Sequence, residues 1–130
     1  MARVLLDTTV LIDALRGRPA AERLRGLRGA SDVPMICAVN VEEIWRRVRP
    51  DEHDVTHRFL RGLRLVPLDY AEGERAGTWR RDHADRGVAL HQADCLIAAA
   101  AVTVAAALAT GNPSHFPMAE VEVDHWPVGQ

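Results

Sequence analysis

The chain has 130 residues and a mass of 14.3 kDa, which predicts one domain, residues 1–130, large enough to bury a hydrophobic core. Its formal net charge of −2 excludes a uniformly basic surface for nucleic acid. All 16 basic side chains are arginine, however, and eleven of them lie between Arg16 and Arg64. One face of the protein can therefore still bind phosphates. Alternatively, these arginines only occupy solvent-exposed positions on helices.

The two cysteines indicate a reducing compartment. Cys37 and Cys95 lie in apolar segments and form no CxxC pair, so free buried thiols are expected rather than a disulfide or a zinc site. The alanine-rich run over residues 96–108 is too short to cross a membrane. We therefore expect a soluble, cytoplasmic protein without membrane contact.

Short apolar strands alternate with helices along the whole chain. Helical spacing of apolar residues and capping signals predict helices over 8–15, 20–27, 41–48, 51–62, 70–86 and 91–104. Short apolar runs predict strands over 4–7, 32–39, 65–68, 106–110 and, at an edge, 121–123. This alternation predicts an α/β fold in which a parallel sheet carries helices on both faces.

Two acidic residues follow the first two predicted strands. Asp7 ends the first strand, where open α/β sheets bind their ligands. After the second strand, Asn40 is the expected N-cap of a helix, and Glu43 lies one turn in at the same sheet edge. Alternatively, Glu43 only reaches back to cap the helix at Asn40. Its neighbour Glu42 is expected to pair with Arg46.

A third carboxylate lies in the most apolar helix. Burial of Asp94 there is costly unless a cation or a basic group compensates its charge. Alternatively, His91, one turn earlier, pairs with Asp94, and the pair has a structural role only. Asn112 and His115 follow the fourth strand, again where the strand ends meet a cleft.

The three carboxylates predict a metal-dependent nuclease. Oxygen ligands from Asp7, Glu43 and Asp94 suit Mg²⁺ or Mn²⁺, which can activate a water for attack on a phosphodiester. Arg46 and Arg47 are candidates for holding the flanking phosphates. A receiver-like regulatory module is the rival, but it needs a lysine opposite its phosphorylated aspartate, and the sequence has no lysine.

Four segments in order resemble the motifs of PIN domains, most closely those of VapC-type toxins. They are residues 5–13, 37–44, 93–99 and 108–116. The resemblance implies a PIN-like three-layer α/β/α sandwich with a central, mainly parallel sheet of four to five strands. It also implies an endoribonuclease that needs Mg²⁺ or Mn²⁺, and that acts as the toxin of a VapBC pair.

The resemblance assigns individual roles and partners. Asp7, Glu43 and Asp94 become metal-binding catalytic carboxylates, and Thr9 supports them. Asn112 and His115 stand where many relatives have an acid, so Asn112 is expected to orient water or phosphate. Because this acid is missing, the number of bound metal ions, one or two, stays open. A catalytically weak or inactive module that only binds metal and RNA also stays open as an alternative.

The implied partners are an RNA substrate, a VapB-like antitoxin and a second copy of the chain in a homodimer. DNA would be contacted only indirectly, through the antitoxin. The expected antitoxin-docking surface is a groove between the first helices and residues 51–63.

Overall fold

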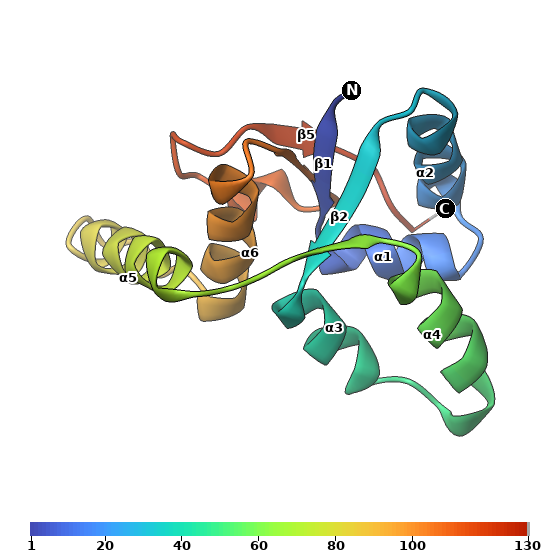
Figure 1. Cartoon of the computed structure of the whole chain (residues 1–130). Helices are drawn as coiled ribbons and strands as arrows, with labels where there is room; N and C mark the ends of the chain where they lie inside the picture. Colours follow the sequence, from blue (N-terminus) through green and yellow to red (C-terminus); the bar gives the residue numbers. More distant parts are fainter. Residues whose placement is uncertain (130) are drawn as a thin grey trace.

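The computed structural model describes residues 1–129 and contains a five-stranded sheet (Figure 1). Its strands are β1 (Arg3–Leu6), β2 (Val33–Cys37), β3 (Arg64–Val66), β4 (Ala107–Thr110) and β5 (Val123–His125). The strand order is β3-β2-β1-β4-β5, and each neighbouring pair is parallel. The carboxyl ends of β2, β1 and β4 therefore meet at one edge of the sheet, as the sequence predicts.

Within residues 1–129, six α-helices connect and cover the strands. They are α1 (Thr8–Leu15), α2 (Pro19–Gly29), α3 (Ala38–Trp45), α4 (His53–Arg61), α5 (Tyr70–Ala84) and α6 (Gln92–Thr103). Two single 3-10 turns, Pro50–Glu52 and Pro113–His115, precede α4 and follow β4. In residues 1–129 no helix is both long and apolar enough to cross a bilayer.

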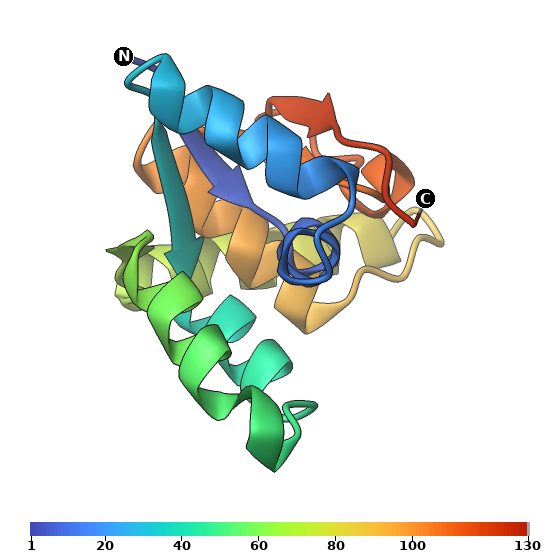
Figure 2. The same ribbon diagram turned by 90° about the vertical axis from the view of Figure 1, so that its right-hand side faces the viewer.

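The two faces of the sheet carry separate hydrophobic cores. Leu5 of β1 packs in the core with α5 and α6, whereas Val4 and Leu6 pack in the core with α1, α2, α3 and α4. This division follows from the period-2 alternation of side chains along a strand. Figure 2 shows α2 and α4 in front of the sheet and α6 behind it. The predicted three-layer α/β/α fold is confirmed.

Helix α6 is the most buried helix. Ala98, Ala99, Ala100 and Ala101 are all fully buried, because their small side chains let α6 lie close to both the sheet and α5. Cys95 on the same helix and Cys37 at the end of β2 are free thiols, as expected, and burial raises the pKa of both.

Several predicted boundaries differ from the structure, and three of the differences have a clear physical reason. Helix α3 begins at Ala38 rather than 41, and its N-cap is Cys37, because the side chain of Asn40 accepts the Cys37 N–H. Strand β3 ends at Val66, since Pro67 has no N–H for the ladder. The last strand is Val123–His125 rather than 121–123, because Val121 is taken into the core instead.

Candidate active site

Asp7 lies at the carboxyl end of the central strand β1 and is only 5% exposed. It is the N-cap of α1, where its Oδ1 accepts the Thr8 N–H at 2.8 Å. Its Oδ2 accepts the hydroxyls of Thr9 at 3.1 Å and Thr110 at 2.7 Å. Three donors from α1 and β4 therefore hold the Asp7 carboxylate in one orientation. The Gly111 N–H donates to the Thr9 hydroxyl and so helps to fix one of them.

A chain of hydrogen bonds connects Glu43 to the same edge. The Asn40 side chain is fully buried, accepts the Cys37 N–H at 2.8 Å and donates to the Thr8 hydroxyl at 3.1 Å. The Thr8 hydroxyl donates in turn to Glu43 Oε1 at 2.7 Å. The helix-capping interpretation of Glu43 was wrong, because α3 is capped at Cys37, whose N–H donates to the Asn40 side chain, and Glu43 instead accepts the Thr8 hydroxyl. Thr8 links the two carboxylates by its amide and its hydroxyl.

Asp94 lies in the first turn of α6, and its side chain is 20% exposed. Burial raises the pKa of Asp94, and the negative charges of Asp7 and Glu43 raise it further, while His115 and His91 act in the opposite direction. The three carboxylates thus lie close enough to repel one another. The imidazole Nδ1 of His115 is 3.4 Å from Asp94 Oδ2, so His115, rather than His91, is the contacting partner.

The segment after β4, where many relatives have an acid, contacts the site through its backbone. Asn112 is exposed, and its backbone N–H donates to the Thr110 hydroxyl at 2.9 Å. Thr110 is fully buried, and its hydroxyl donates in turn to Asp7 Oδ2. Neither Thr8 nor Thr110 is predicted as a site residue, although Thr110 ends a buried strand and Thr8 directly follows one. That same signal identified Asp7.

The two arginines expected to bind phosphate are in different situations. Arg46 makes two hydrogen bonds to Glu42, at 2.9 and 2.6 Å, which confirms the predicted i,i+4 pair and occupies its guanidinium group. Arg47 is exposed and lines a hollow that also contains Thr9. Arg47 is therefore the better placed of the two for a phosphate.

The donors of the site suit Mg²⁺ or Mn²⁺. All three acidic groups offer hard carboxylate oxygens, and their mutual repulsion favours a cation between them. Within residues 1–129, however, no three Asp, Glu, His or Cys side chains converge tightly enough to form a complete metal shell. An open site suits Mg²⁺, which usually keeps several waters and takes one or two carboxylates together with substrate phosphates.

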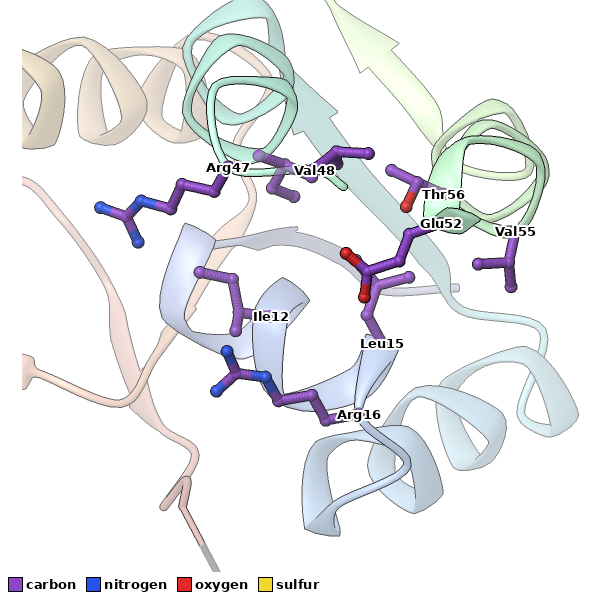
Figure 3. A pocket seen from close by; sticks show the side chains of 9 residues that line it. Ile12, Leu15, Arg16, Arg47, Val48, Glu52, Val55 and Thr56 are labelled. Atoms are coloured by element: carbon purple, nitrogen blue, oxygen red, sulfur yellow. The ribbon is translucent and has the colours of Figure 1, made fainter. Parts of the chain in front are cut away.

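A groove lies beside this site, between α1 and the segment that joins α3 to α4 (Figure 3). Its volume is about 140 Å³, and the aliphatic residues that line it are Ile12, Leu15, Ile44, Val48 and Val55. Arg16, Arg47 and Glu52 supply charges at its margin, and the three carboxylates do not line it. This is the place where the sequence predicts a docking groove.

Comparison with known sequences relates residues 4–120 to the PIN domain family model. The chain is 36% identical over 120 residues to Ribonuclease VapC19 of Mycobacterium tuberculosis, an alignment that covers 88% of this chain and 92% of that protein. It is 35% identical over 122 residues to Ribonuclease VapC10 of the same species, with 90% and 88% covered.

Solved structures share the fold at lower identity. A VapBC2 complex from Rickettsia felis, bound to a DNA fragment from its promoter, has a TM-score of 0.82 at 19% identity and covers 95% of this chain and 98% of that chain. A DNA-bound VapBC complex from Salmonella typhimurium has a TM-score of 0.81 at 22% identity, with 97% and 99% covered.

Proposed function

Because this chain belongs to the PIN-domain family and matches VapC relatives over most of its length, we propose that it is an endoribonuclease, the toxin of a VapBC-type pair. The observation that carries the proposal is that Thr8 joins Asp7 and Glu43 at the carboxyl edge of the sheet, with Asp94 near enough for their charges to raise its pKa. Such a site has little use in a purely structural protein, because repulsion between the carboxylates destabilises the fold.

The proposed roles follow from the contacts. Asp7, Glu43 and Asp94 would hold one divalent cation, Mg²⁺ or Mn²⁺, which would supply charge neutralisation and would activate a water for attack on phosphorus. Thr9 and Thr110 fix the direction of the Asp7 oxygens, and Asn40 fixes Glu43 through Thr8. The exposed Asn112 side chain orients water or phosphate, and His115 supports Asp94.

Cleavage of an end-labelled RNA should require Mg²⁺ or Mn²⁺ and should stop in EDTA. Products with a 5′-phosphate are expected, since the attacking group is water and not the ribose 2′-hydroxyl. Mass spectrometry of the fragments measures this directly. Full activity in EDTA, or a 2′,3′-cyclic phosphate as the sole product, would contradict the proposed mechanism.

A catalytically weak or inactive module that binds metal and RNA is the second candidate. The observation that favours it is the exposed amide of Asn112 where the family pattern has an acid. The same assay separates the two proposals, because an inactive module would bind the labelled RNA without shortening it under any metal condition.

The proposed protein partner is a VapB-like antitoxin that docks in the groove of Figure 3. Its support is the structural likeness to VapBC complexes, two of which contain DNA, together with the aliphatic lining of the groove. We also propose a homodimer, contact with DNA only through the antitoxin, and a cytoplasmic location, which suits two free buried thiols.

Val55→Glu should weaken antitoxin binding at least about tenfold, because it places a charge in an apolar groove beside Glu52. Leu65→Glu is the matched control: Leu65 is also 55% exposed, and it lies on β3 outside the groove. Isothermal titration of each variant with the VapB-like protein measures the affinities. Equal affinities for the two variants would exclude this groove as the docking surface.

A further inference from the structure

A second hollow, of about 270 Å³, lies next to the candidate active site. Three of the residues that line it are arginines: Arg16 and Arg18 lie in the connection between α1 and α2, and Arg47 follows α3. The rest of the lining consists of Thr9, Ile12, Asp13, Val128 and Gly129. The fold thus brings the positive charge of Arg47 beside those of Arg16 and Arg18, from which it is distant in the sequence.

Within residues 1–129 the guanidinium groups of these three arginines have no carboxylate partner. Several other arginines do: Arg25 pairs with Glu22, Arg46 with Glu42, Arg49 with Glu52 and Arg81 with Asp82. Asp13 is the one acidic side chain that lines the hollow, and it is buried. Its two oxygens accept backbone N–H groups from Ala20 at 3.0 Å and Gly129 at 2.9 Å. The hollow therefore retains an excess of positive charge that an anion can neutralise.

The position of the hollow relates it to the carboxylates. Thr9 lines the hollow and also donates its hydroxyl to Asp7. Asp7 and Arg16 cap opposite ends of α1, so about 13 Å separates them along the helix axis, at 1.5 Å per residue. A single phosphate cannot reach both ends, whereas a short stretch of polynucleotide can.

We propose that Arg16, Arg18 and Arg47 form a subsite for backbone phosphates of the RNA, on the α1 side of the phosphodiester that is cleaved. This inference rests on the proposed ribonuclease function and adds residues that bind the strand away from the reacting bond. Arginine suits the role, since its planar fork can donate two hydrogen bonds to one phosphate.

The subsite and the groove of Figure 3 overlap. Ile12, Arg16 and Arg47 line both, and Figure 3 shows the Arg16 and Arg47 side chains extending toward the same side of the groove. An antitoxin seated in the groove would thus cover part of the RNA subsite, even without touching the carboxylates.

The test measures binding of a fluorescein-labelled single-stranded oligoribonucleotide in EDTA over a series of salt concentrations. Each phosphate neutralised on a single strand contributes about 0.7 to the slope of log K against log salt. The triple variant Arg16→Ala, Arg18→Ala, Arg47→Ala should lower that slope by about 2. The control Arg58→Ala, Arg61→Ala, Arg64→Ala removes the same charge from exposed positions on α4 and β3 and should leave the slope unchanged.

Equal slopes for the two triple variants would overturn the subsite. So would an unchanged slope combined with weaker antitoxin binding, because the arginines would then serve the protein partner. Circular dichroism checks folding, and the single variant Arg18→Ala, in an exposed connection, should lower the slope by about 0.7 if the triple variant unfolds.

Activity separates this inference from the ribonuclease proposal. With Mn²⁺, the triple variant should raise KM for RNA with little change in kcat, and should hydrolyse bis(4-nitrophenyl) phosphate as the wild type does, since that small diester does not span α1. An inactive wild type whose RNA binding still depends on the three arginines would support the subsite and refute the ribonuclease. Normal RNA cleavage with identical KM in both triple variants would support the ribonuclease and refute the subsite.

Discussion

Asp94→Asn is expected to lower RNA cleavage about a thousandfold, which corresponds to about 4 kcal/mol of lost transition-state stabilisation. The change removes one of three carboxylates while keeping the size of the side chain. Asp94 is also the cleanest of the three to test, because its polar contact in residues 1–129 is with His115 alone, whereas Asp7 caps a helix. Initial rates with Mg²⁺ and with Mn²⁺ measure the loss.

Asp85→Asn is the matched control, since Asp85 is an exposed carboxylate at the end of α5. Its cleavage rate should equal that of the wild type. If Asp94→Asn also cleaves RNA at the wild-type rate, the enzymatic role of the carboxylate cluster is refuted.

Asp94→Asn should also change how the free energy of unfolding depends on pH. Burial and the charges of Asp7 and Glu43 raise the pKa of Asp94, so the folded chain holds that proton more tightly than the unfolded chain. In EDTA, the free energy of unfolding contributed by this group therefore falls as pH rises from its unfolded pKa through its raised folded pKa. Denaturation of wild type and Asp94→Asn across acidic pH should show this difference, with the variant more stable at neutral pH.

Asn40→Ala is expected to lower the free energy of unfolding by about 2–3 kcal/mol. Asn40 is fully buried, and its removal leaves the buried Cys37 N–H without its acceptor and the Thr8 hydroxyl without a donor. Cleavage should fall as well, about tenfold or more, because the freed Thr8 hydroxyl no longer holds Glu43 in place. Chemical denaturation and RNA cleavage under native conditions measure the two effects.

Asn112→Ala provides the comparison for stability, because it deletes the same amide from an exposed position. Its free energy of unfolding should stay within about 0.5 kcal/mol of the wild type. Equal destabilisation by the two alanine variants would show that the Asn40 hydrogen bonds contribute nothing beyond the loss of an amide.

The local sequence was enough to predict most elements and the three acidic positions. Apolar periodicity places β1 before Asp7 and β2 before α3, and parallel strands bring their carboxyl ends together. The predicted start of α3 was wrong, because the sequence does not show whether Asn40 is the N-cap or the third residue of a capping box. The choice between them depends on whether the Asn40 side chain meets the Cys37 amide, which a one-dimensional pattern does not contain.

The sequence by itself determined which segments become strands and helices, and therefore that Asp7 and the start of α3, which carries Glu43, lie at one sheet edge. Only the tertiary structure decided which hydroxyl holds which carboxylate and which arginines remain unpaired. The Thr110–Asp7 hydrogen bond joins residues 103 apart, and the Asn40–Thr8 bond joins residues 32 apart. Such contacts depend on strand register and helix packing to within a fraction of an ångström, because a hydrogen bond weakens steeply outside its narrow range of distance and angle.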